Sequence, residues 1–264
     1  LTAEEALGGS AFAMYLGDNL LRNGISDLAD HFRQDEHDAL ILLTKVPDPW
    51  HYGVAELAGD EVVRLVEKPK DPPSNMALVG VYLFGPAIFD AARAIEPSAR
   101  GELEITDAIQ YLIDNGSRVE SRTVSGWWKD TGQLADMLEA NRLVLEDLEG
   151  SIEGELVESR AEGRVRLARG ARVGRSVIRG PVIIGEDARI VDAYVGPYTS
   201  IERGVEIARS EVEHSILLAG SRVHDLESRL EASLLGRNVT LRRGETMPRT
   251  LSMIVGDNAD IVLP

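Results

Sequence analysis

Residues 177–196 decide the fold of the second half of the chain, and they read VIRGPVIIGEDARIVDAYVG. The aliphatic positions Ile178, Ile184, Ile190 and Val195 follow one another at steps of six, six and five residues. A helix would show a period of 3.6 and a half-buried strand a period of two. A cycle of seventeen residues instead predicts a three-sided coil with one inward side chain on each side.

The same period extends in both directions, to about residue 241. Glycines follow inward positions at Gly185, Gly196 and Gly236, and we expect them to form tight corners with positive φ. A β-sandwich with evenly spaced strands is the alternative. Three aliphatic columns share the seventeen-residue spacing: Leu167, Ile184, Ile201, Leu218, Leu235; Leu156, Val173, Ile190, Ile207; and Ile178, Val195, Val212.

These columns predict a parallel β-helix of hexapeptide-like coils over residues 150–244, with one side a residue short of six. A stacked prism of this kind needs covered ends, and residues 245–264 are expected to cap one of them. Its flat, repetitive faces favour a homo-oligomer.

The first part, residues 1–149, has a different pattern. An apolar run at 11–16, a helical stretch at 26–34 and a second apolar run at 39–44 predict a βαβ unit with buried parallel strands. The domain is therefore expected to be an α/β sheet whose ligands lie beyond the carboxyl ends of its strands. Further strands are predicted at 61–66, 77–84 and 119–124, and helices at 86–95, 105–115 and 132–148.

Composition excludes several classes of function. The formal net charge of −16 argues against nucleic-acid or anionic-membrane partners, which need a basic surface. The absence of cysteine excludes disulfides and thiol chemistry, so a metal would be held by oxygen or by five histidines, and Mg²⁺ fits that inventory best. No apolar stretch reaches eighteen residues and no secretory signal is visible, which predicts a soluble, cytoplasmic protein.

Two aspartates stand at the ends of predicted strands. Asp18 follows the first apolar run, and Asp130 follows the strand at 119–124. Two carboxylates that reach the same sheet edge could hold one Mg²⁺ against a nucleotide's phosphates, although each aspartate taken alone is more typical of a turn. A second Gly-Asp-Asn at 256–258 is interpreted as a capping turn.

The triplet Glu67-Lys68-Pro69 ends another predicted strand and offers an acceptor for hydroxyls beside a cation for a phosphate. Pro69 restricts the backbone of Lys68, so this side chain is held in one direction. An ordinary surface Glu-Lys pair is the alternative.

Six motifs occur in a characteristic order: 16–19 (LGDN), 52–54 (YGV), 66–69 (VEKP), 79–82 (VGVY), 100–107 (RGELEITD) and 128–132 (WKDTG). This series resembles the sugar-nucleotide pyrophosphorylases, most closely the long-form glucose-1-phosphate thymidylyltransferases, over essentially the whole chain. The resemblance implies a Rossmann-like nucleotidyltransferase sheet, here incomplete, and a C-terminal left-handed β-helix.

The resemblance also implies roles for individual residues. Asp18 and Asp130 match the metal-binding pair, and Lys68 and Arg100 match the cations that hold the sugar phosphate. The groups that match contacts to the hexose or the reacting phosphates are Asn19, Glu67, Glu104, Trp128 and the backbones of Gly53 and Leu78.

The implied reaction is attack of a sugar 1-phosphate on the α-phosphorus of a nucleoside triphosphate, dTTP for this subfamily, with Mg²⁺ as cofactor. GTP, ATP or UTP remain alternatives. The family's glycine-rich loop, with its arginine and the lysine after it, would precede Leu1, so the chain is expected to be a fragment that is inactive alone.

Two other functions compete. In a hexapeptide-repeat acyltransferase a histidine of the coils would act as base, and His214 and His224 are the candidates. A non-catalytic relative that only binds nucleotide would be expected to lack the carboxylate pair, which this chain keeps.

Overall fold

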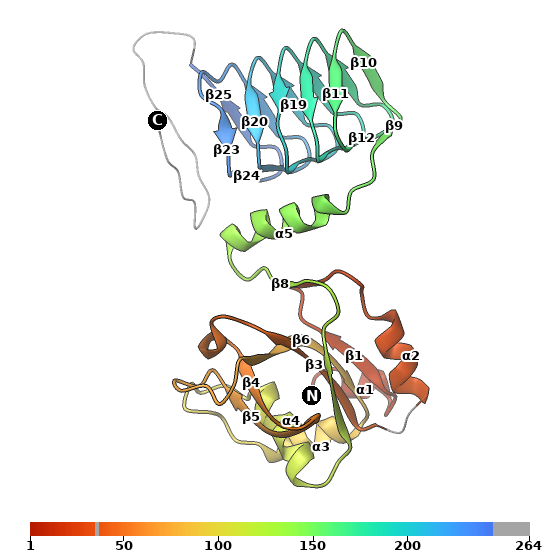
Figure 1. Ribbon diagram of the computed structural model, residues 1–264, viewed down its shortest axis with the longest axis vertical. Helices are drawn as coiled ribbons and strands as arrows, with labels where there is room; N and C mark the ends of the chain where they lie inside the picture. The colour runs from red at the N-terminus through yellow and green to blue at the C-terminus, as the bar shows by residue number, and fades with distance from the viewer. Residues whose placement is uncertain (35–36, 245–264) are drawn as a thin grey trace. The chain divides into compact units, whose positions relative to one another are not determined.

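The computed structural model describes residues 1–34 and 37–244, in two compact units, Leu1–Gly132 and Gln133–Pro264 (Figure 1). The division falls before the helix at Leu134–Glu146, which the sequence pattern grouped with the first domain. The expected capping tail at 245–264, with its Gly-Asp-Asn, lies outside the described residues. Among the described helices, none combines the length and the apolar character needed to cross a membrane.

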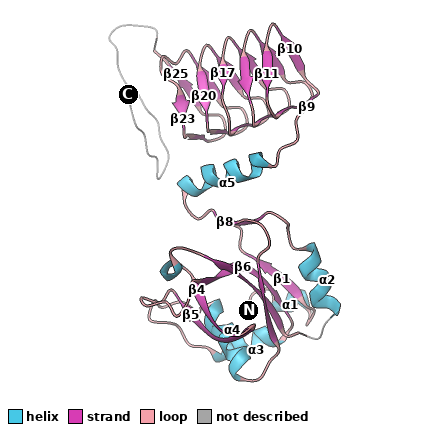
Figure 2. Ribbon diagram, in the orientation of Figure 1, coloured by secondary structure: helices cyan, strands magenta, loops and turns pink. Residues whose placement is uncertain are grey.

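The first unit is built on a mixed sheet in the order β5-β4-β6-β3-β7, with β1 also paired to β6. Figure 2 shows the strands in magenta and the helices in cyan. Its strands are β1 (Phe12–Tyr15), β3 (Ala39–Lys45), β4 (Gly53–Ala58), β5 (Glu61–Glu67), β6 (Met76–Phe84) and β7 (Val119–Thr123). Its helices are α1 (Glu4–Leu7), α2 (Ser26–Gln34), η1 (Pro49–His51), α3 (Ala87–Ala94) and α4 (Ile105–Asp114). A short ribbon pairs β2 (Asn19–Leu21) with β8 (Trp128–Asp130).

Strand β6 organises this sheet. It is buried at all nine positions and is an almost unbroken apolar run, as expected of a central strand. Both β1 and β3 run antiparallel to it, so the predicted β1-α2-β3 unit is present with β6 between its strands. Among the described strands of this sheet, β3 and β7 are parallel neighbours. The expectation of a buried β1 was wrong, because β1 is half exposed.

Both faces of the sheet are covered. Alternate residues of β3 point to opposite faces, so Ile41 packs in the cluster that contains α3 and α4, while Leu40 and Leu42 pack with Phe32 of α2. The predicted α/β domain is therefore confirmed.

The second unit contains α5 (Leu134–Glu146) and a three-sided parallel solenoid whose sheets have six, five and six strands. The β-helix predicted from the seventeen-residue columns is confirmed. The strands are β9 (Ser151–Ile152), β10 (Glu155–Val157), β11 (Arg160–Glu162), β12 (Val165–Leu167), β13 (Arg172–Gly174), β14 (Val177–Arg179), β15 (Val182–Ile184), β16 (Arg189–Val191), β17 (Tyr194–Val195), β18 (Thr199–Ile201), β19 (Glu206–Ala208), β20 (Glu211–Glu213), β21 (Ile216–Leu217), β22 (Arg222–His224), β23 (Leu230–Glu231), β24 (Leu234–Leu235) and β25 (Thr240–Arg242).

One position in the columns was predicted wrongly. Leu217, not Leu218, pairs with Ile201 and is fully buried. The segment from Val212 to Leu217 is one residue shorter than the equivalent segment of earlier coils. Since the parallel strands keep their pairing, Leu217 takes the inward position. A side of the following coil is longer and compensates for the lost residue. Leu235 therefore lies in the column predicted for it, where it pairs with Leu217.

The corner glycines also differ from expectation. Gly185 has no positive φ; a Cβ there would lie 2.7 Å from the backbone nitrogen of Arg203, so this glycine permits close approach of the next coil. One column of corner residues with left-handed φ values alternates in charge and forms the bidentate pairs Arg175–Asp192 and Arg209–Asp225. The column is Glu158, Arg175, Asp192, Arg209 and Asp225.

Helix α5 lies against the solenoid within the second unit. The amide of Asn141 donates to the carbonyl oxygen of Tyr198 at 2.8 Å and accepts a hydrogen bond from the hydroxyl of Ser200. Arg164 of the solenoid donates to the carbonyl oxygen of Glu146. These polar contacts fix the helix on one side of the coils.

Candidate active site

The two predicted metal ligands meet through the β2-β8 ribbon. Asn19 pairs with Asp130, and Asp18 lies just before β2, where its carbonyl oxygen accepts hydrogen bonds from both the backbone and the hydroxyl of Thr131. A Cβ placed on Gly132 would lie 3.3 Å from Oδ1 of Asp130 and 3.9 Å from Oδ2 of Asp18. Both carboxylates therefore approach one small space, at the ribbon rather than at the expected edge of the main sheet.

Asn19 holds this arrangement together. Its side chain is buried, donates to Oδ1 of Asp18 at 2.8 Å, and accepts from the backbone of Gly80 at 3.0 Å and from the indole of Trp128 at 2.6 Å. Its amide oxygen is thus occupied by two donors. The geometry makes Asn19 a positioning residue that orients Asp18 and Trp128 and anchors both to β6.

A second group of predicted residues gathers around Gly53. This residue lies opposite Glu67 in the β4-β5 pair. Because Val54 is paired with Ala77 in antiparallel β4 and β6, Gly53 also lies beside Leu78. A Cβ on Gly53 would come within 2.9 Å of the Thr106 hydroxyl, so only glycine fits here without displacement.

Glu67 and Arg100 form the charged part of this group. The hydroxyl of Thr106 donates to Oε2 of Glu67 at 2.6 Å, while Oε1 faces Arg100 at 3.5 Å. Arg100 also lies 3.0 Å from Glu102 and 3.5 Å from Glu104. Glu104 is buried, accepts a hydrogen bond from the hydroxyl of Ser98, and lies directly before α4.

Lys68 has an unusual backbone. Its φ is 40°, and among the described residues of the first unit it is the one non-glycine residue with a positive φ. Its N–H donates to the carbonyl oxygen of Tyr52 at 3.0 Å. A strained conformation fixed between a strand end and Pro69 is typical of residues kept in place for function. The backbone of Lys68 is therefore not in the extended region that a following proline favours.

Tyr52 joins the two groups and was not predicted as a site residue. Its carbonyl oxygen holds Lys68, and its ring meets that of Trp128 edge to face at 5.5 Å. Thr106 and Gly80 were missed in the same way. All three stand inside the quoted motifs, but a sequence does not reveal which motif residues orient the others.

The donors present fit Mg²⁺. Two carboxylates converge on a space that a single Cβ would partly fill, and hard oxygen ligands suit this ion. Protein sites for Mg²⁺ commonly supply one or two carboxylates and leave other positions to phosphates and water. Asp18 and Asp130 would hold the ion.

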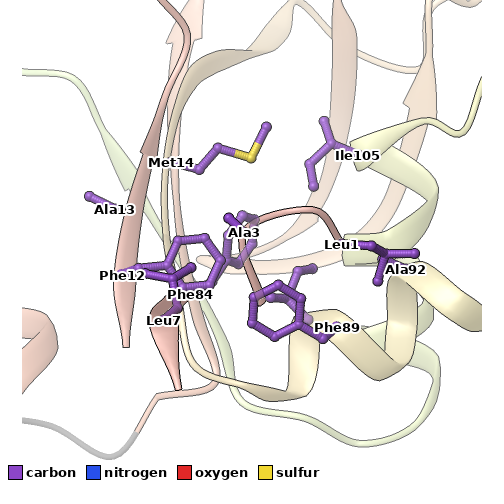
Figure 3. A pocket seen from close by; sticks show the side chains of 11 residues that line it. Leu1, Ala3, Leu7, Phe12, Ala13, Met14, Phe84, Phe89, Ala92 and Ile105 are labelled. Carbon is purple, nitrogen blue, oxygen red and sulfur yellow. The ribbon is translucent and has the colours of Figure 1, made fainter. Parts of the chain in front are cut away.

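An apolar hollow of about 410 Å³ lies elsewhere in the first unit, and Figure 3 shows its lining. None of the predicted site residues lines it, and it offers no charged group for a phosphate. It therefore has no part in the polar site. Its lining residues are Leu1, Ala3, Leu7, Phe12, Ala13, Met14, Phe84, Ile88, Phe89, Ala92 and Ile105.

Gly132→Ala is expected to lower turnover roughly tenfold at limiting Mg²⁺, because the added methyl group must displace the Asp130 carboxylate by a few tenths of an ångström. Steady-state rates against Mg²⁺ concentration test this. Gly17→Ala is the matched control beside Asp18, since a Cβ there meets nothing within 4 Å. Equal Mg²⁺ dependence in both variants would contradict the placement.

Comparison with known proteins decides the family. Residues 1–147 match the family model described as nucleotidyl transferase. The chain belongs to the nucleotidyl transferase family. A glucose-1-phosphate thymidylyltransferase of Streptomyces antibioticus is 52% identical over 264 residues, which cover 99% of this chain and 74% of that protein. The protein of the same name from Streptomyces griseus is 47% identical over 98% of this chain and 73% of its own length.

A solved structure supports the same membership. A Bacillus anthracis protein described as a glucose-1-phosphate thymidylyltransferase, in complex with sucrose, superposes with a TM-score of 0.51 and 33% identity. The match covers 57% of this chain and 60% of the Bacillus chain. The chain is thus a nucleotidyl transferase by sequence and fold, as the motif series predicted.

The histidines expected of an acyltransferase do not share a site. His224 lies in β22 with Glu206 3.8 Å away, whereas His214 lies after β20 with its ring against that of Tyr198. They stand on different sides of the coil. No observation in the described residues favours acyl transfer.

Proposed function

We propose that this nucleotidyl transferase transfers dTMP from dTTP to glucose 1-phosphate and releases pyrophosphate. The observation that carries the proposal is the convergence of Asp18 and Asp130 on one space, with Glu67 in contact with Arg100 near Gly53. Relatives named as glucose-1-phosphate thymidylyltransferases support the choice of both substrates. GTP, ATP or UTP as donors are the alternatives.

Two contacts to strand β6 support an order for the two substrates. Gly80 contacts Asn19 and so belongs to the carboxylate pair, whereas Leu78, two residues earlier, lies beside Gly53 and Glu67. We therefore place the triphosphate at Asp18 and Asp130 and the hexose at Glu67, with Trp128 beside the reacting phosphates. Mg²⁺ bound there would supply neutralisation of the charge on the phosphates.

The side chains of the sugar group match a phosphorylated hexose. Oε1 of Glu67 lies 3.5 Å from Nη1 of Arg100, which is a long contact. This oxygen can therefore accept a hydrogen bond from a sugar hydroxyl. Arg100 lies close to the carboxylates of Glu67, Glu102 and Glu104, which orient its guanidinium. The arginine side chain stays 43% exposed, so it is open to a ligand. Together with Lys68 it supplies two cations for one sugar phosphate.

The step itself needs positioning more than proton transfer. An oxygen of the sugar phosphate, already anionic at neutral pH, forms a bond to the α-phosphorus, and the bond to the β-phosphate oxygen breaks with its electron pair leaving on pyrophosphate. No general base is required. This agrees with a site made of carboxylates, cations and backbone groups.

Lys68→Ala and Arg100→Ala are expected to raise the KM for glucose 1-phosphate by roughly 10- to 100-fold, because each removes a charge-assisted contact to the sugar phosphate. The KM for dTTP should change less than about threefold. Initial-rate kinetics with each substrate varied in turn measure both values. An equal rise for the two substrates would show that these cations serve the triphosphate instead.

We further propose a cytoplasmic homo-oligomer with Mg²⁺ as its cofactor and a transferase domain over residues 1–149. The family match, which ends at residue 147, supports that functional boundary, although the compact units divide after Gly132. The tail at 245–264 is proposed to cap the solenoid.

A further inference from the structure

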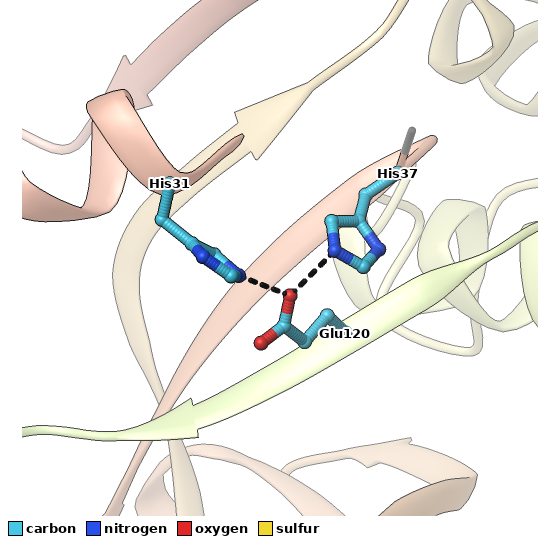
Figure 4. Close-up of side chains that lie close together, drawn as sticks. All are labelled: His31, His37 and Glu120. Carbon is cyan, nitrogen blue, oxygen red and sulfur yellow. Dashed lines mark hydrogen bonds and ion pairs between the residues drawn. The ribbon is translucent and has the colours of Figure 1, made fainter. Parts of the chain in front are cut away.

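A cluster of metal-binding groups lies in the first unit, apart from every residue assigned above. His31 of α2, His37 just before β3 and Glu120 of β7 point toward one another (Figure 4). Their ligand atoms lie within 4.8 Å of one another. The side chain of His37 is 7% exposed, and those of His31 and Glu120 are each 24% exposed, so the cluster is shielded but reachable from solvent.

The geometry centres on one oxygen. Oε2 of Glu120 lies 2.8 Å from Nε2 of His31 and 2.8 Å from Nε2 of His37. In a tetrahedral zinc site neighbouring ligand atoms stand roughly 3.3 Å apart, so an outward shift of roughly 0.5 Å would admit an ion. Two imidazole nitrogens and one carboxylate oxygen are a donor set typical of first-row divalent metals, with open positions for water.

Arg122 orients the carboxylate. Its Nε donates to Oε1 of Glu120 at 2.8 Å, which leaves Oε2 facing the histidines. This is the outer hydrogen bond that metal-ligating carboxylates commonly have.

The same arginine creates a conflict at His31. Its Nη2 lies 2.7 Å from Nε2 of His31, the atom that also faces Oε2 of Glu120. A guanidinium can only donate and a carboxylate can only accept, so this one ring nitrogen cannot serve both at once. A bound ion would resolve this conflict by accepting the lone pairs of Nε2 of His31 and Oε2 of Glu120. The side chain of Arg122 is 40% exposed, so its Nη2 could then hydrogen-bond to water instead.

We propose that His31, His37 and Glu120 bind a first-row divalent metal ion of the Zn²⁺ type, which ties α2 to the β3-β7 edge of the sheet. The three ligands come from three elements, and β3 and β7 are already paired at Leu40 and Glu120. Helix α2 has one fully buried residue, Phe32, with Leu28 packed partly buried beside it, so a metal link would strengthen an attachment that is now mostly apolar. The site is structural and distinct from the carboxylate pair, Asp18 and Asp130, that is proposed to hold Mg²⁺.

The test titrates ZnCl₂ into the metal-free, full-length protein in excess Mg²⁺, by calorimetry and thermal unfolding. We expect one saturable site of micromolar or tighter affinity and a rise in melting temperature of at least about 3 °C. His31→Gln, His37→Gln and Glu120→Gln should each weaken binding by at least about tenfold. His51→Gln, in the same unit but outside the cluster, should bind as the wild type does.

Co²⁺ gives an independent reading that does not depend on the variants' stability. Its visible absorption in the wild-type protein should intensify on binding, since imidazole ligands in a low-symmetry site replace water. No saturable site, a cobalt spectrum like that in buffer, or equal binding by the three variants would overturn the proposal. Loss of zinc binding in the Asp18→Asn, Asp130→Asn double variant would also overturn it, by placing the zinc at the carboxylate pair.

Discussion

Asp18→Asn and Asp130→Asn are each expected to lower kcat of the full-length protein by roughly 10³-fold or more while leaving the fold intact. Each substitution removes one anionic ligand from the space that both carboxylates approach. The amide keeps the shape of the side chain, so Asn19 can still donate to position 18 and Gly132 to position 130. The loss should therefore be one of charge rather than of structure.

Pyrophosphate release at saturating dTTP and glucose 1-phosphate measures this effect, with circular dichroism to confirm folding. Asp60→Asn is a suitable control, because Asp60 is an exposed turn residue of the same unit. Turnover near the wild-type level with an unchanged Mg²⁺ requirement in either variant would remove the metal assignment. It would leave the family membership untouched, since that rests on the sequence match and the fold.

Ile190→Asp is expected to destabilise the solenoid by roughly 4 kcal/mol, because it buries a charge in an aliphatic core. Ile190 is fully buried in the aliphatic cluster that runs through the coils. Arg189→Asp is the matched control: the neighbouring residue of β16 points outward and is exposed, so the same aspartate there should change stability by less than about 0.5 kcal/mol.

Denaturant unfolding of both variants gives the difference in free energy, and the unfolding slope shows whether the transition stays cooperative. Similar stability of the two variants would mean that the column through Ile190 does not face the interior. Such a result would contradict the three-sided coil itself.

Several features were predictable because they depend on periodicity. A side chain every six, six and five residues can face inward only in a three-sided coil, so Ile178, Ile184, Ile190 and Val195 were identified as core from spacing alone. Leu218 was the exception. When one side of a coil is a residue shorter, the inward position falls one residue earlier, here at Leu217. Only the pairing of Leu217 with Ile201 reveals which side is shorter.

The sequence by itself determined the β-helix, the α/β class and the residues that carry charge at the site, because hydrophobic period and residue chemistry are local properties. Tertiary structure decided which of those residues meet. The β2-β8 pairing brings Asp18 to Asp130 across more than a hundred residues, and Asn19, Tyr52 and Thr106 orient their neighbours through hydrogen bonds and ring contacts. The cluster of His31, His37 and Glu120 likewise exists only after β7 pairs with β3, since contacts between distant residues depend on strand register, which no local pattern specifies.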